Sequence, residues 1–132
     1  MSTGFDVLDR LYPCLNVATV TATIDGRVYR RKRPHNSVKR DIVIIPYSLR
    51  DGEGLDVQPG IVFINCFAKN KASGFVDRTN LKSTTDAVIT QLGRFAQGST
   101  YMNLEVVSES TFDDVDREDW SYSSIRVRVI IE

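Results

Sequence analysis

The last strand-like segment, "SIRVRVII", most constrains how this chain can fold. Apolar side chains occupy every second position from Ile125 to Ile131, and Arg126 and Arg128 stand between them. In a β-strand, alternate side chains point to opposite faces of the sheet. This segment therefore predicts a sheet with one face on the core and the other facing water or a partner.

Other segments also have the character of strands. The runs around Ile42–Ile45 and from Gly60 to Ala68 are apolar on both parities, which is typical of strands with both faces at least partly covered. "VATVTATI" is rich in Thr and Val, which favours a strand. Asp25-Gly26 follows it, and Asp-Gly between two such runs is a strong hairpin signal because both turn residues need a positive φ. We therefore predict a hairpin whose second arm is "RVYRRKR".

Two segments have the three- and four-residue apolar spacing of amphipathic helices. The first lies near the N-terminus, where Ser2 or Thr3 can cap the helix and Pro13 should end or distort it. The second spans residues 75–98 and places Gly98 where a C-terminal glycine belongs. The expected inner stripes are Phe5, Leu8, Leu11, Tyr12 and Leu15 in the first helix and Leu81, Val88, Leu92 and Phe95 in the second.

The order of elements is thus helix, hairpin, two strands, helix, two strands. A chain of 132 residues is long enough to bury one core without cross-links, and no linker divides it, so we expect one domain over residues 1–132. The predicted fold class is α+β. We expect a single sheet of about five or six mostly antiparallel strands, two helices on one face, and a projecting β-hairpin or loop.

Charge is balanced overall but segregated along the chain. Lys and Arg number seventeen and Asp and Glu seventeen, a balance that argues against a dedicated nucleic-acid-binding domain. Seven of the bases lie between Arg27 and Arg40, and seven acids with a single base lie between Glu105 and Asp119. The molecule therefore carries a positive segment early and a negative segment late.

The residues that usually carry catalysis are sparse. His35 is the only histidine and sits in the basic stretch, while Cys14 and Cys66 lie in apolar contexts that disfavour a thiolate. Three scattered Cys and His residues do not make a structural zinc site. Gly52-x-Gly54 precedes a strand and not a helix, so we interpret it as a turn and not as a phosphate loop. We expect no enzymatic activity, no metal and no cofactor.

The two cysteines and the apolar profile bear on location. The cysteines lack any paired-motif spacing, so we expect reduced, buried thiols. No apolar stretch approaches the roughly 20 residues that cross a bilayer. The N-terminus has no basic start followed by an apolar run, so it does not look like a secretory signal. Together these features predict a soluble, intracellular protein that does not enter membranes.

Several interpretations of the basic stretch stay open. It can be a solvated loop tip, a targeting signal, a nucleic-acid grip that neutralises phosphates, or a contact between copies of the chain. In the last case, opposite charges on one small domain suit a head-to-tail contact, which closes into a ring when the rotation allows. The basic candidates are Arg27, Arg30, Arg31, Lys32, Arg33, His35, Lys39 and Arg40, and the acidic ones are Asp113, Asp114, Asp116, Glu118 and Asp119.

The order of several motifs resembles the tail-terminator, or tail-completion, proteins of long-tailed bacteriophages and prophages. The shared outline is an initial helix, a "V-Y…R-P" segment, an "I-V-I" strand, an "N-x-F/V" strand, a helix near "D…L…I…L" and a last alternating strand. In this chain the matching residues are Val28-Tyr29, Arg33-Pro34-His35-Asn36-Ser37, Asp41-Ile42-Val43-Ile44, Ile64-Asn65-Cys66-Phe67, and Asp77, Leu81, Ile89 and Leu92, and the closing strand is "SIRVRVII". The early Asp-Gly hairpin signal is stronger than that outline suggests.

The resemblance implies an α+β domain that forms a ring, commonly a hexamer, on top of the completed tail tube. Such a ring stops further tube subunits from adding, contacts the head-tail connector and passes DNA through its lumen without sequence specificity. The implied location is the virion, at the head-tail junction, after synthesis in the host cytoplasm. The alternatives are another neck or tail-tube component, or a small nucleic-acid-binding accessory protein.

Overall fold

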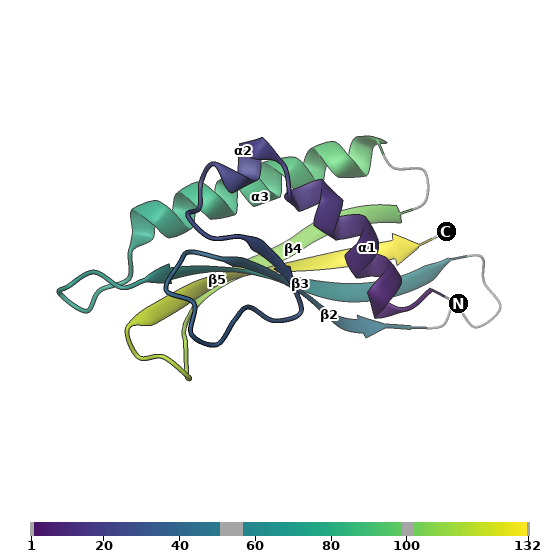
Figure 1. The fold of residues 1–132 in the computed structure, drawn as a ribbon. Coiled ribbons are helices and arrows are strands. Elements are labelled where there is room, and N and C mark those ends of the chain that lie inside the picture. The colour runs from purple at the N-terminus through teal and green to yellow at the C-terminus, as the bar shows by residue number, and fades with distance from the viewer. Residues whose placement is uncertain (1, 51–56, 99–101, 132) are drawn as a thin grey trace.

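The computed structural model describes residues 2–50, 57–98 and 102–131. It contains a helical N-terminal region, a five-stranded sheet and one long helix, shown in Figure 1. The predicted turn at Gly52-x-Gly54 lies outside the described residues. The elements, in chain order, are α1 (Gly4–Leu15), α2 (Ala18–Thr21), β1 (Val28–Arg30), β2 (Ile42–Leu49), β3 (Gln58–Lys69), α3 (Arg78–Gly98), β4 (Met102–Asp113) and β5 (Trp120–Ile131).

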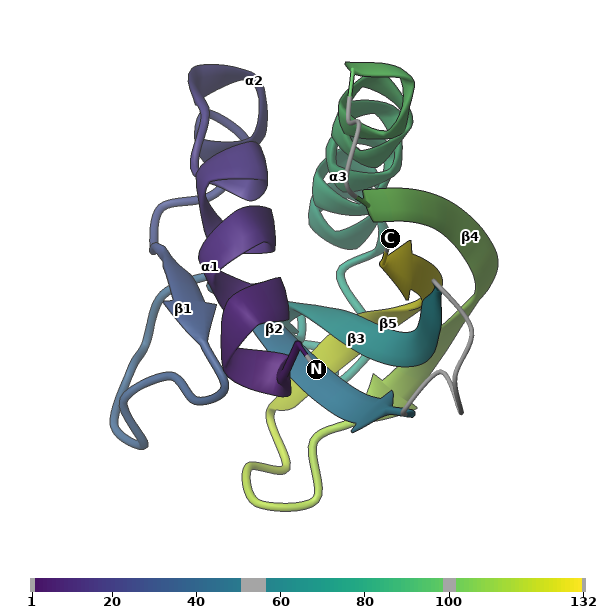
Figure 2. The same ribbon diagram turned by 90° about the vertical axis from the view of Figure 1, so that its right-hand side faces the viewer.

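The sheet has the strand order β1-β2-β3-β5-β4. β1 runs parallel to β2, and the remaining neighbours are antiparallel. Figures 1 and 2 show the three helices on one side of this sheet, and the described residues place no helix on the opposite side. The prediction of an α+β fold with one mostly antiparallel sheet is therefore confirmed.

The main core lies between the helices and the sheet. In β3 the even-numbered residues from Gln58 to Ala68 are buried, and β5 buries Ile125, Val127 and Val129 on the same face because these residues pair with β3. The alternation predicted for the last strand is thus confirmed. The side chains that the two helices add to this core are Val7, Leu8, Leu11, Cys14 and Leu15 from α1 and Val88 and Leu92 from α3.

The first helix begins as predicted but differs from its prediction at Pro13 and Phe5. Thr3 is its N-cap, and the Thr3 backbone N–H donates to the Asp6 carboxylate at 2.7 Å. Pro13 does not end the helix, which continues to Leu15. Phe5 belongs to the expected inner stripe but is 65% exposed, because its ring lies under the guanidinium of Arg31 and not in the core.

The predicted hairpin around Asp25-Gly26 is wrong. "VATVTATI" contains α2, whose Val20 is buried in the core, and β1 pairs in parallel with β2. Asp25 and Gly26 instead bind the chain far downstream, since the Asp25 carboxylate accepts the Arg40 N–H at 2.7 Å and the Gly26 N–H donates to the Arg40 carbonyl at 3.0 Å. Long-range contacts thus override the local propensity of this segment.

Both cysteines are free and buried, as predicted. Burial raises the pKa of the Cys14 thiol to about 11, against the opposing effect of a hydrogen bond with Gln91, and raises that of Cys66 to about 12. The nucleophile is the thiolate, so neither group should react near neutral pH. We expect almost no labelling of the native protein by iodoacetamide at pH 8 and labelling of both thiols in urea. Rapid labelling of either thiol in the native protein would contradict this burial.

Among the described residues, no helix combines the length and apolar character that a membrane crossing needs.

Candidate subunit interface

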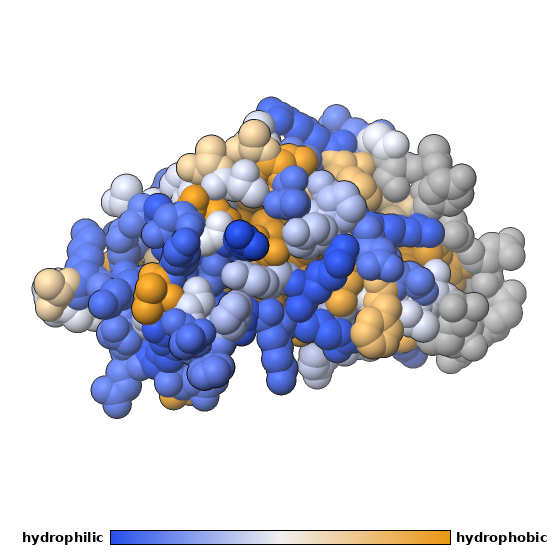
Figure 3. Space-filling view, viewed as in Figure 1, coloured by the Kyte–Doolittle hydropathy of each residue, from blue (hydrophilic) through white to orange (hydrophobic). Residues whose placement is uncertain are grey.

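The basic and acidic segments lie together in one chain. We call residues 31–40, the loop between β1 and β2, the basic arm, and residues 114–119, the loop between β4 and β5, the acidic tip. The arm is a loop at the β1 edge of the sheet, drawn in dark blue in Figures 1 and 2, and the contacts described below tie it back to the sheet. Figure 3 shows that the surface around the arm and the tip is mostly hydrophilic.

Arg33 joins the arm to the side of the sheet that the helices leave open. Its guanidinium carbon lies 4.0 Å from the ring centroid of Phe67 and 4.7 Å from that of Trp120, within cation–π range. Its Nη1 lies 3.5 Å from Asp41 Oδ2, and its Nη2 lies 3.7 Å from Asp114 Oδ2. Burial lowers the pKa of Arg33, and the Asp41 carboxylate acts in the opposite direction. One arm arginine is therefore paired with one tip carboxylate inside the same subunit.

A second contact fastens the tip to the arm. The Arg117 guanidinium lies 4.7 Å from the Trp120 ring centroid and donates to the backbone carbonyl of Ser37. Trp120 is 1% exposed and Val43 is 3% exposed, yet neither belongs to the main core cluster. Their places in the strand registers put them on the open face. The arm thus covers a second, smaller core on that face.

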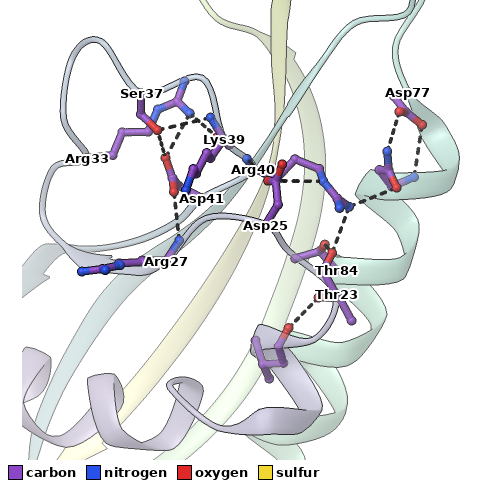
Figure 4. A network of polar contacts seen from close by, with 12 residues as sticks. Thr23, Asp25, Arg27, Arg33, Ser37, Lys39, Arg40, Asp41, Asp77 and Thr84 are labelled. Carbon is purple, nitrogen blue, oxygen red and sulfur yellow. Dashed lines mark hydrogen bonds and ion pairs between the residues drawn. The ribbon is translucent and has the colours of Figure 1, made fainter.

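Asp41 holds the base of the arm, as Figure 4 shows. Its side chain is 1% exposed, and it accepts hydrogen bonds from the Arg27 N–H at 3.0 Å and from the Ser37 hydroxyl. A Cβ at Gly26 would lie 2.0 Å from Asp41 Oδ1, so Gly26 is required by a close approach of this carboxylate.

Three more arginines among the candidates are bound within their own chain. Arg30 lies 4.3 Å above the Tyr12 ring and 3.9 Å from Asp9. Arg31, with φ of 67°, lies 4.7 Å above Phe5. Arg40 donates to the Thr23 carbonyl and to the side chain of Asn80, which ties the arm to the start of α3; Figure 4 shows this link. These contacts hold the start of the arm against α1 and its end against α3.

The remaining candidates are exposed. Arg27, Lys32, His35 and Lys39 are the exposed bases that make no ring contact or ion pair in the described structure. Among the acids, Asp113, Asp116 and Glu118 are exposed, whereas Asp119 lies 3.6 Å from Lys69. Contact between copies through these exposed groups stays a prediction. Arg33 and Asp114 each have a partner in their own chain, and a role for them between copies also stays a prediction.

Three residues at the centre of the arm–tip contact had no place among the sequence candidates. The sequence patterns gave no role to Asp41 or Trp120, and Arg117 counted only as the single base in the acidic segment. A signal was present, since the only tryptophan follows the only base of the acidic segment by three positions. Its meaning depends on strand order, because β3 must lie beside β5 to bring Phe67 near Trp120.

A polar groove between α3 and β4 is the other candidate site. It encloses about 660 Å³, and Lys71, Arg78 and Thr85 contribute to its lining. At its base the Thr85 hydroxyl donates to Ser123 Oγ at 2.9 Å, and the Ser123 hydroxyl donates to Glu109 at 2.8 Å. The chain's only histidine lies on the arm and not in this groove, so the hydroxyls have a carboxylate acceptor but no imidazole base.

Comparison with known proteins places the fold. No protein-family model matches the chain, and no curated protein matches it in sequence. Among solved structures, it is similar to a chain of the virion of a native gene transfer agent (GTA) particle, with a TM-score of 0.68 and 17% identity. The match covers 92% of this chain and 91% of that chain. At this identity the likeness shows a shared fold.

Proposed function

We propose that this chain is a structural protein of a phage-like virion and that it acts as a tail terminator. It forms a ring of identical copies, commonly a hexamer, on the end of the tail tube. The ring stops tube growth and presents its other face to the head-tail connector. Its location is the head-tail junction, and DNA passes through its lumen.

The observation that carries this proposal is the shared fold with a chain of the GTA virion, which extends through nearly all of both chains. The motif order of tail-terminator proteins supports the narrower role. The same fold offers an open sheet face and two charged segments, which are the surfaces that assembly of identical copies needs. Termination requires no bond-breaking step, because a ring that mimics a tube subunit on one face only will block addition.

Arg27 and the exposed bases of the arm fit the lumen of such a ring. Arg27, Lys32 and Lys39 are exposed, while the arginines around them are held by aromatic rings and carboxylates. Exposed Lys and Arg bind DNA through phosphates, without base readout. These positions therefore suit contact with passing DNA and need no sequence recognition.

The proposal predicts a closed oligomer that caps tail tubes. Light scattering should give a mass that is an integral multiple of the 14.9 kDa subunit, and negative-stain images should show rings. Added to growing tail tubes of the same virus, the protein should stop their elongation at sub-stoichiometric amounts.

Two outcomes would contradict this role. Rings that bind finished tubes without stopping growing ones would indicate another neck component. A monomer that binds an oligonucleotide with steep salt dependence would indicate a nucleic-acid accessory protein.

A further inference from the structure

The open face of the sheet has a covered half and an uncovered half. The arm lies over the half that contains Val43, Phe67 and Trp120. The other half carries apolar and basic side chains without an overlying element among the described residues. We call this half the basic–aromatic patch; its residues are Tyr47, Ile61, Phe63, Arg126 and Arg128.

The patch is built by pairing across three strands. Tyr47 is 72% exposed, and its ring meets Phe63 edge-on with centroids 5.5 Å apart. Phe63 pairs with Arg126, and Ile61 pairs with Arg128. Arg128 is bound to Glu105 of β4, whereas Arg126 is exposed beside the rings. The patch therefore offers aromatic surface next to a guanidinium, the side-chain types enriched in protein interfaces.

The acidic tip has the complementary chemistry. Val115 is 94% exposed and lies between the exposed acids Asp113 and Asp116, with Glu118 close behind. The tip is held in shape, because the Asp116 N–H donates to Asp114 Oδ1 at 3.1 Å and the Trp120 N–H donates to the Arg117 carbonyl at 3.0 Å. Because the tip already has a fixed shape, Val115 and the neighbouring acids lose little conformational entropy on binding.

We propose that the acidic tip of one copy docks on the basic–aromatic patch of the next copy. Val115 contacts Tyr47 and Phe63, and the tip carboxylates face Arg126. This inference rests on the proposed ring function and names the surface that receives the tip. Six to eight residues of β5 separate Trp120 from these arginines, roughly 20–26 Å at the rise of a strand, so one chain cannot make the contact with itself.

The patch is a better receptor for the tip than the basic arm. Within one subunit Arg33 already pairs with Asp114, and Arg117 already holds Ser37, so the arm's charge lies beside the acids that it would attract. The patch lies in the half of the sheet that is farther from the tip. Unlike surfaces at opposite ends give a heterologous contact, which forms rings when it closes.

Disulfide trapping tests the contact, using exposed positions that should not affect folding. The native Cys14 and Cys66 are buried with raised pKa values, so they give little background. In the Tyr47→Cys/Val115→Cys protein, oxidation should give a ladder of covalent oligomers that ends at the ring number. Each single variant should stay monomeric on the denaturing gel, because a heterologous contact brings unlike positions together.

A matched pair tests the rival contact at the arm. Val38 is 74% exposed on the arm, so Val38→Cys/Val115→Cys reports tip-to-arm docking. Because the tip and the arm already meet within one subunit, only covalent oligomers count for this pair. Covalent oligomers from this pair, with none from the Tyr47 pair and with normal rings, would overturn the inference and leave the virion role intact. Trapping at Tyr47 in a protein that does not arrest tubes would support the contact and overturn the terminator role. A wild-type protein that is monomeric with and without tubes, and gives no trapping, would overturn both.

Charge reversal separates protein docking from nucleic-acid binding at the patch. Arg126→Glu should raise the concentration for half-assembly on the order of tenfold, and Glu118→Arg added to it should restore assembly. Arg94→Glu, at an exposed base of α3, should leave assembly unchanged. If Arg126→Glu instead abolishes binding of a fluorescent single-stranded oligonucleotide and leaves assembly intact, the patch is a nucleic-acid site and the inference is wrong.

Discussion

Replacement of Asp41 with alanine should lower the free energy of unfolding by about 3–5 kcal/mol. The carboxylate is 1% exposed and faces the guanidinium of Arg33, whose side chain is 9% exposed. Its loss leaves that buried cation without its nearest counter-charge and also leaves the Arg27 N–H and the Ser37 hydroxyl without their acceptor. Urea denaturation followed by fluorescence of the only tryptophan, Trp120, measures the change at the site itself.

Two further variants test whether the buried carboxylate of Asp41 causes this loss of stability. Asp25→Ala removes another carboxylate that accepts an arm N–H, but the Asp25 side chain is 60% exposed, so the loss should stay below about 1 kcal/mol. Gly26→Ala keeps the Asp41 carboxylate but places a Cβ only 2.0 Å from Oδ1, so it should reproduce much of the Asp41→Ala effect. If Asp41→Ala costs no more than Asp25→Ala, the buried ion pair does not hold the arm.

Periodicity predicted the parts of the fold in which one face meets the core. The alternation from Ile125 to Ile131 and the apolar runs of β2 and β3 are confirmed, and so is the long helix that ends at Gly98. In each segment, local spacing and burial agree, because the segment is long enough for its apolar residues to define a face.

The short elements could not be predicted in the same way. Residues 17–24 have strand propensity but contain a four-residue helix, and three residues form β1. Asp25-Gly26 satisfies the hairpin rule locally, yet its backbone and side chain bind Arg40. Such choices depend on contacts between residues about fifteen positions apart, which no short window contains.

The candidate site shows the same division. The two charged segments were visible in the sequence, but their contact with each other in the folded chain was not. The strand order determines how the two segments meet, because β3 lies beside β5 and so brings Phe67 near Trp120. The Arg33 guanidinium then packs on these two rings next to Asp114. The exposed patch of Tyr47 and Arg126 depends on strand register as well, since these residues are far apart in the chain.

Trp120→Ala should also cost about 3–5 kcal/mol, but its effect on local motion should distinguish it from a main-core mutation. The Trp120 ring is 1% exposed and supports the guanidiniums of Arg33 and Arg117 outside the main core cluster. Its removal should therefore accelerate hydrogen exchange in the arm, at the amides of Ser37 and Arg40, well before exchange rises in α3. Leu11→Ala, in the main core, should cost about 2–5 kcal/mol and raise exchange evenly across the sheet and helices. Uniform exchange in Trp120→Ala would mean that the arm and the main core unfold as one unit.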